Sequence, residues 1–284
     1  RKAVLALAEA TAADAVPIHF STVSEADVHV EEVLEGELAG AMGRGEIVIA
    51  FQPQIQIDTG QLVGAEALAR WEHPEYGLLG ASTLFSVAER AGVMESLSTQ
   101  IHKQALTLAA GWADSLGFLR LSINVTAGDL ATAAFDEDML RQVDAAGFEP
   151  DRLTLEITES ELIGNLSASA DKLHRLRKAG ICIAIDDFGT GYSSLSYLKQ
   201  LPVDYLKIDS GLTGDISGSA KDQVVVRSII DMAHSLNLSV IAEGVETEAQ
   251  LKTLEEQGCE FFQGFLRSGP LSPDEFEAFA LRSN

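Results

Sequence analysis

The sequence predicts an α/β barrel of parallel strands, and three observations point to this class. Apolar strands alternate with amphipathic helices along most of the chain. The stretch from residue 36 to 284 has the length of about 250 residues that is usual for such a barrel. Polar residues stand near the ends of successive strands, where a (β/α)8 barrel gathers them at one mouth. The alternative is an open doubly wound sheet, but the chain has no G-x-G-x-x-G turn after an early strand.

Composition excludes several classes of function. The chain has 284 residues, of which 46% are hydrophobic, and its formal net charge is −23. Such an acidic protein does not bind a nucleic-acid backbone by charge, so we expect no DNA partner. A phosphate-ester substrate would need cations between itself and the acids. No apolar run approaches about 18 residues, so we expect no membrane contact by this segment.

The two cysteines, Cys182 and Cys259, lie in apolar stretches without a Cys-x-x-Cys partner. We interpret them as buried free thiols of a protein in a reducing, cytoplasmic compartment. The chain begins at Arg1 without a Met, which we interpret as a piece of a longer protein that could be membrane-anchored elsewhere. We expect residues 1–31 to be a linker or the tail of a preceding domain, and residues 32–284 to be one barrel domain.

In the first half of the barrel, local signals bound each expected element. A helical pattern stops at Gly43, and an alternating strand interrupted by Pro53 follows. The next strand holds Glu66, and two helices separate it from a strand that holds Asn124. The expected elements are helix 32–42, strands 47–57 and 62–69, helices 82–91 and 96–115, strand 119–125 and helix 136–146.

The second half of the barrel shows the same alternation of strands and helices. A glycine, such as Gly180, closes most helices before the next strand, and Ser272 with Pro273 forms the capped start of the last helix. The expected elements are strand 153–157, helix 167–179, strands 181–185 and 205–208, helix 220–236, strand 238–242, helix 247–257, strand 259–262 and a final helix.

The stretch 180–195 organises the rest of the chain. Its apolar first half, 181–185, has no solvated face and predicts a central parallel strand buried on both sides. The strand runs into two adjacent carboxylates, Asp186 and Asp187, and then into a loop with two glycines. Acids at the carboxyl end of a buried strand, followed by such a loop, are typical of a metal site in an α/β enzyme.

Further polar residues occupy equivalent positions on other strands. Because the carboxyl ends of barrel strands face one mouth, we expect them to surround one cavity. Crowded carboxylates need a compensating cation, and oxygen ligands favour Mg²⁺, Mn²⁺ or Ca²⁺ over a soft metal. The candidates are Glu66, Asn124, Glu156, Asp186, Asp187, Lys207, Asp209, Glu243 and Gln263.

Several motifs resemble the EAL-domain family of cyclic di-GMP phosphodiesterases, over roughly residues 32–281. They are FQPQI at 51–55, EALARW at 66–71, SINVTA at 122–127, EITES at 156–160, IDDFGTGYSSLSYL at 185–198, LKID at 206–209, AEGVET at 242–247 and QGF at 263–265. The resemblance implies a barrel with one antiparallel strand. It implies metal-dependent hydrolysis of cyclic di-GMP to linear pGpG, which lowers the level of a bacterial second messenger.

Two other functions stay open at this stage. A non-catalytic receptor for cyclic di-GMP is the first alternative, although such family members usually lack several of the acids that this chain keeps. A barrel hydrolase acting on another phosphodiester is the second. The resemblance further implies Mg²⁺ or Mn²⁺ as cofactor, two per site, with Ca²⁺ inhibitory. It also implies a homodimer and an upstream sensor or GGDEF-type domain in the full-length protein.

The resemblance implies a role for each matching position. Metal ligands would be Glu66, Asn124, Glu156, Asp186 and Asp187, the last two sharing a second cation. Catalytic groups would be Lys207, Asp187 and Glu243, the last either as general base or as a metal-site residue. Substrate contacts would be Gln52, Arg70, Glu246 and Gln263. Regulation through the loop and the dimer would involve Glu159, which holds the loop 187–194, together with Asp209.

Overall fold

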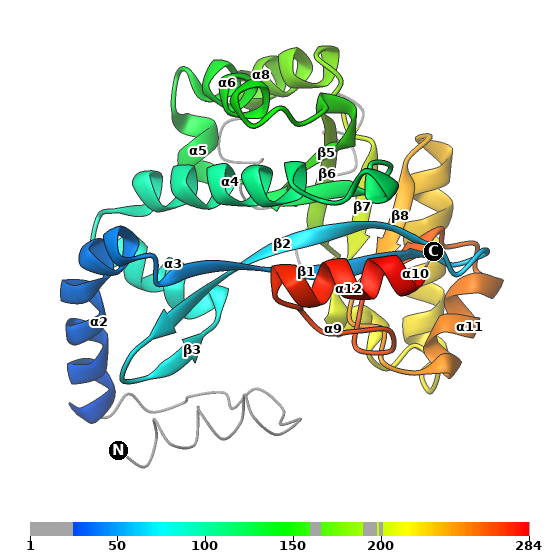
Figure 1. Cartoon of the computed structure of the whole chain (residues 1–284). Helices are drawn as coiled ribbons and strands as arrows, with labels where there is room; N and C mark the ends of the chain where they lie inside the picture. The colour runs from blue at the N-terminus through cyan, green and yellow to red at the C-terminus, as the bar shows by residue number, and fades with distance from the viewer. Residues whose placement is uncertain (1–24, 160–165, 190–197, 199–200, 284) are drawn as a thin grey trace. The chain divides into compact units, whose positions relative to one another are not determined.

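The computed structural model describes residues 25–159, 166–189, 198 and 201–283 (Figure 1). Most of the predicted linker, residues 1–24, and most of the predicted regulatory loop, residues 190–194, lie outside the described residues. The helices are α2 (Glu25–Arg44), α3 (Ala81–Arg90), α4 (Met94–Ala110), α5 (Ala127–Ala131), α6 (Phe135–Ala146), α8 (Leu166–Lys178), α9 (Ser210–Thr213), α10 (Ala220–Ser235), α11 (Glu248–Glu256) and α12 (Pro273–Ser283). The strands are β1 (Ile47–Gln56), β2 (Leu62–His73), β3 (Gly77–Leu79), β4 (Arg120–Asn124), β5 (Leu153–Thr158), β6 (Cys182–Phe188), β7 (Tyr205–Ile208), β8 (Ser239–Ala242) and β9 (Phe261–Phe262).

Eight strands close into a barrel in the order β1-β9-β8-β7-β6-β5-β4-β2, and pairing between β1 and β2 completes the ring. From β2 through β4 to β9 all neighbours are parallel, whereas β1 is antiparallel to β9. The short strand β3 adds an antiparallel extension to β2. The predicted (β/α)8 barrel with one antiparallel strand is thus confirmed, and the open doubly wound sheet is excluded.

The chain divides into two compact units. The first comprises residues 1–49 and 69–104, and the second comprises residues 50–68 and 105–284. In the first unit, α2 and α3 pack together, and Arg90 of α3 pairs with Glu31 and Glu35 of α2. The second unit holds strands β4 to β9, most of β1 and β2, and the helices that follow β4 to β9.

Side-chain alternation along the strands decides which residues enter the barrel. On β5, Leu155 and Ile157 are fully buried on one face, while Thr154 and Glu156 take the other. The same alternation on β1 puts Phe51 on the outward face, where its ring packs 5.4 Å from those of Trp112 and Phe276 of α12. Polar side chains at the alternate positions therefore point into the ring.

Most predicted elements match the structure to within a few residues. Three short elements, β3, α5 and α9, were not predicted from the sequence. The second helix of the first crossover ends at Ala110 rather than near residue 115 because Gly111 follows. The central strand also continues to Phe188, so Asp186 and Asp187 lie within β6 rather than beyond it.

Both cysteines are free thiols; Cys259 is buried, as predicted, whereas Cys182 is only partly buried. Burial raises the pKa of the Cys259 thiol to about 12. Among the described helices, none has the length and apolar character that crossing a membrane requires.

Candidate active site and metal centre

The ammonium group of Lys207 forms the centre of the site. The Lys207 side chain is completely buried on β7, and four carboxylates surround its Nζ atom. Nζ lies 2.7 Å from Glu243 Oε1, 3.2 Å from Asp186 Oδ2 and 3.3 Å from Glu66 Oε2, and it also contacts Glu156 Oε2. One fully buried positive charge thus faces four acidic groups, of which Asp186 and Glu243 are partly exposed to solvent.

Strand register explains why residues so distant in sequence meet here. Asn124 of β4 stands opposite Glu156 of β5, and neighbouring strands in a sheet are about 4.8 Å apart. Lys207 of β7 lies on the same face, two residues beyond the row of Glu156, because Glu156 pairs with Ala184 of β6 and Ala184 with Tyr205 of β7. Inward positions on consecutive strands therefore converge on one volume.

A layer of amides orients Glu66. Asn124 Nδ2 donates to Glu66 Oε1 over 2.8 Å, and Gln263 Nε2 donates to Glu66 Oε2 over 2.6 Å. Gln263 Nε2 also donates to Glu243 Oε1 over 3.3 Å. Both oxygens of Glu66 are thus held by fixed donors on different strands.

Asp186 and Asp187 reach the same side of the sheet because β6 is irregular there. Consecutive strand residues normally point to opposite faces. The pairing of β6 with β7 shifts register between Ile185 and Phe188, and Asp187 has φ of 55°, a left-handed conformation that Asp tolerates better than most residues. In consequence Asp186, Asp187 and Glu243 offer carboxylate oxygens that all lie within 4.8 Å of one another.

Burial and crowding shift the protonation of these groups. Burial, and then repulsion from the Glu66 charge, raises the pKa of Glu156 well above its ordinary value. Burial likewise raises the pKa of Glu243 to about 8, although Lys207 acts in the opposite direction. Burial and the neighbouring Asp186 charge raise the pKa of Asp187. Protons therefore compensate part of the negative charge when no metal is bound.

For Glu66 and Lys207, neighbouring charges and hydrogen bonds outweigh the effect of burial on the pKa. Burial alone would raise the pKa of Glu66, but Lys207 and the amide donors outweigh it and lower that pKa. Burial alone would lower the pKa of Lys207, but the surrounding carboxylates raise it well above its ordinary value. Glu66 and Lys207 therefore form the charged pair around which the other acids are arranged.

The donor set fits a hard divalent cation. Every negatively charged donor is a carboxylate oxygen, and such ligands favour Mg²⁺ or Mn²⁺. Glu156 Oε1 is buried and finds no hydrogen-bond partner among the described residues, so one ligand atom is available without breaking a bond. The acidic cluster could thus bind metal, as the sequence predicted.

The other predicted site residues make further contacts, and the charge of Asp209 also raises the pKa of Asp187. Gln52 donates to the carbonyl oxygen of Ser268 over 3.5 Å, and Arg70, in the first unit, donates to the carbonyl oxygen of Ala69. Glu246 is exposed, Asp209 caps the start of α9 by accepting from the Gly211 amide, and Glu159 is buried just after β5. Their predicted roles in substrate binding and regulation stay predictions.

The sequence analysis missed Gln54, which is 4% exposed on β1. Its Nε2 atom donates to Gln263 Oε1 over 3.2 Å and to Ser122 Oγ over 3.5 Å. A signal was present: glutamines at positions 52, 54 and 56 alternate with apolar residues and so share one face of the strand.

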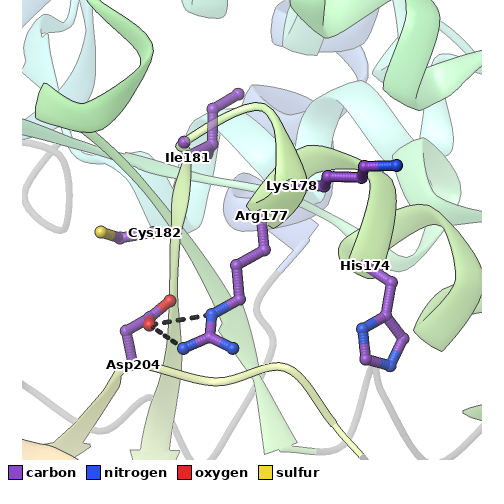
Figure 2. A pocket seen from close by; sticks show the side chains of 7 residues that line it. His174, Arg177, Lys178, Ile181, Cys182 and Asp204 are labelled. Carbon is purple, nitrogen blue, oxygen red and sulfur yellow. Dashed lines mark hydrogen bonds and ion pairs between the residues drawn. The ribbon is translucent and has the colours of Figure 1, made fainter.

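A separate cavity of about 470 Å³ lies at the start of β6, whereas the acidic cluster lies at its end (Figure 2). His174, Arg177 and Lys178 of α8 line it, and Arg177 pairs with Asp204 across it, with distances of 2.8 and 3.0 Å to Asp204 Oδ1. It has none of the clustered acids of the metal site, so we do not assign the reaction to it.

Comparison with known proteins places this geometry in a family. The family model described as EAL domain matches residues 35–270. The chain is 38% identical over 247 residues to the protein named "Cyclic di-GMP phosphodiesterase NbdA" of Pseudomonas aeruginosa, which covers 87% of this chain and 32% of that protein. It is 35% identical over 260 residues to "Bifunctional diguanylate cyclase/cyclic di-GMP phosphodiesterase MucR" of the same organism, covering 91% and 38%. The chain thus spans less than half the length of these curated relatives.

Solved structures agree with this assignment. The structure titled "PaMucR Phosphodiesterase, c-di-GMP complex" superposes with a TM-score of 0.82 at 36% identity, covering 86% of this chain and 99% of that one. A manganese and cyclic di-GMP complex of Klebsiella pneumoniae BlrP1 superposes with a TM-score of 0.71 at 33% identity, covering 80% and 56%. The family match spans most of the chain and includes every element that supplies the acidic cluster, so this chain belongs to the EAL domain family.

Proposed function

We propose that this chain is a metal-dependent phosphodiesterase that hydrolyses cyclic di-GMP to the linear dinucleotide pGpG. The observation that supports this best is the cluster of carboxylates around the buried Lys207, together with the Asp186, Asp187 and Glu243 trio. Membership of the EAL domain family and relatives named for this activity support the same substrate. A receptor that only binds the dinucleotide would not need this complete set of acids.

The residues that would hold Mg²⁺ or Mn²⁺ fall into two groups. Glu66, Asn124, Glu156 and Asp186 surround Lys207 or contact its partners. Asp187 joins Asp186 in the trio with Glu243, which also contacts Lys207. We therefore expect two cations per site, with Asp186 in both groups. The cations would screen the acids from the phosphate and lower the pKa of an attacking water.

Side chains of the site would stabilise charge, accept a proton and orient the ligands. Lys207 stands where its ammonium can offset negative charge that grows on the phosphate oxygens during attack. Glu243 would accept the proton of the water, or else act as a ligand, because its carboxylate belongs to the trio. Gln263 and Asn124 keep Glu66 in one orientation throughout. Gln52, Arg70 and Glu246 would contact the nucleotide outside the metal centre.

We extend the proposal to the organisation of the protein. Residues 32–284 would form the catalytic domain, and the remaining length of a bifunctional relative such as MucR favours an upstream GGDEF-type or sensor domain. A homodimer would regulate activity through Glu159, Asp209 and the loop that follows Asp187. Activity per molecule should then fall as the protein is diluted through its dissociation range, and constant specific activity would contradict this part.

Incubation of the purified chain with cyclic di-GMP and Mg²⁺ or Mn²⁺, followed by separation of the nucleotides, tests the proposed reaction. We expect pGpG as product, no turnover after chelation, and a rate reduced about 100-fold or more in Glu66→Ala, because one metal ligand contributes several kcal/mol. Glu255→Gln, an exposed change on α11, is the matched control and should keep full activity.

The same assay separates the alternatives. Substrate that stays bound but unchanged would favour a receptor. Faster turnover of another cyclic dinucleotide, added in competition, would favour a hydrolase with a different substrate. Turnover in Glu66→Ala within a few-fold of the unmodified chain would show that the assigned metal site is wrong.

A further inference from the structure

Gln54 is hydrogen-bonded to the Gln263 amide, whose donor end faces the acidic cluster. A glutamine amide has a donor end and an acceptor end of nearly the same shape, so its orientation depends on its partners. Gln263 uses its donor end for two carboxylates, Glu66 and Glu243. Its acceptor end, Oε1, receives a hydrogen bond from Gln54 Nε2 over 3.2 Å.

The position of Gln54 follows from the antiparallel strand. Ile55 pairs with Phe262 and Gln56 with Phe261, so the next step in the same register puts Gln54 opposite Gln263. Both side chains are buried, at 4% and 5% exposure. The second contact of Gln54 Nε2, to Ser122 Oγ at 3.5 Å, ties it to β4, which is separated from β1 in the ring only by β2.

We infer that Gln54 is a positioning residue of the active site, which acts on Glu66 and Glu243 only through Gln263. Reversal of the Gln263 amide would turn its oxygen toward two carboxylates and leave a buried donor facing the donor of Gln54. Each of these contacts is unfavourable in a buried site. Gln54 therefore keeps the donor end of Gln263 directed at a predicted metal ligand and at the predicted base. The inference deepens the proposed function and depends on it only for the activity readout.

A double-mutant cycle tests this indirect action. Gln54→Met removes the donor with little change in volume, and Gln263→Met removes the group on which it acts. We expect Gln54→Met to lower kcat about 10-fold with KM changed less than about 2-fold, since the loss of one buried hydrogen bond between amides has about this size. In the Gln263→Met background the same change should cost less than about 2-fold, because residues that act through one another are not additive.

A second readout is independent of turnover. The affinity for Mn²⁺, measured by calorimetric titration, should fall in both single variants and fall no further in the double variant. Gln54→Glu should be at least as harmful as Gln54→Met, because it places an acceptor against Gln263 Oε1. Gln56→Met, one inward position along the same strand, is the matched control and should keep both kcat and Mn²⁺ affinity.

The two sets of measurements separate failure of this inference from failure of the proposed function. Additive losses in the cycle, for kcat or for Mn²⁺ affinity, would overturn the inference because Gln54 would then act by another route. So would a folded Gln54→Met variant with unchanged kcat and Mn²⁺ affinity. If the unmodified chain hydrolyses nothing while the Mn²⁺ cycle is non-additive, the proposed function fails and the positioning role of Gln54 stands.

Discussion

Replacement of Lys207 by Met should destabilise the metal-free protein strongly and in a pH-dependent way. The side chain is fully buried, and its Nζ contacts four carboxylates. Methionine has nearly the same length but no charge, so the variant leaves the acids without their buried cation. Removing one partner of a buried ion pair costs about 3–5 kcal/mol. For a domain of this size, that corresponds to a fall in Tm of roughly 6–20 °C.

The sign of the pH dependence follows from Glu243. Burial raises its pKa in the folded protein to about 8, above its ordinary value of 4.5. Such a carboxyl contributes stability that is full below the unfolded pKa and is lost as the pH rises through the folded pKa. Without Lys207 the folded pKa of Glu243 rises further, since Lys207 lowers it. The stability deficit of Lys207→Met should therefore be small at pH 5 and largest at pH 8 and above.

Thermal unfolding at pH 5 and pH 8, with chelator and with Mn²⁺, measures this effect. Mn²⁺ should restore most of the lost Tm at pH 8, because a divalent cation bound to the folded state replaces the missing charge. Lys252→Met is the matched control. The Lys252 side chain is 75% exposed, its ammonium lies 3.9 Å from Glu256 Oε1, and such surface pairs contribute about 0–1 kcal/mol. The expected fall in Tm is roughly 6–20 °C. If the Tm of Lys207→Met at pH 8 in chelator lies within about 2 °C of that of the unmodified chain, the reasoning is refuted.

Three further predictions concern the same site. Binding of Mn²⁺ at pH 7 should release protons, because burial raises the pKa of Glu156 and of Glu243. Titration calorimetry in two buffers of different ionisation enthalpy measures the number of protons released. Binding that releases no protons would contradict this prediction. Affinity for Mn²⁺ should accordingly increase up to about pH 8, and a flat profile between pH 6 and pH 8 would argue against protonated ligands. Gly264→Ala should lower both Tm and kcat, since a Cβ there would stand 2.2 Å from the Val245 carbonyl oxygen and displace Gln263; unchanged values would show that the loop can move aside.

The sequence contained enough information for the ring of acids. Alternation on each strand decides which residues point inward, and strand spacing brings inward residues together. Glu66, Asn124, Glu156 and Lys207 follow this rule directly, so their convergence could be predicted without any side-chain geometry. The family motifs added the expectation of one antiparallel strand, which β1 confirms.

Other features depend on geometry that a one-dimensional pattern does not carry. Adjacent acids on a regular strand would face opposite ways, and only the irregular register of β6 and the φ of Asp187 bring both to the cluster. The contact between Gln54 and Gln263 depends on the register of β1 against β9, across two hundred residues of sequence. Short elements such as α5 are set by a local capping box at Thr126 rather than by hydrophobic periodicity.

The central claim is that oxygen donors from separate strands hold a hard cation beside Lys207. A crystal of the chain grown with Mn²⁺ and measured for anomalous scattering tests it most directly. The account predicts a manganese peak with oxygens of Glu66, Glu156 and Asp186 at about 2.0–2.3 Å, and the Lys207 ammonium displaced from Glu156. Manganese found only at exposed surface acids, with Lys207 still in contact with all four carboxylates, would contradict the account.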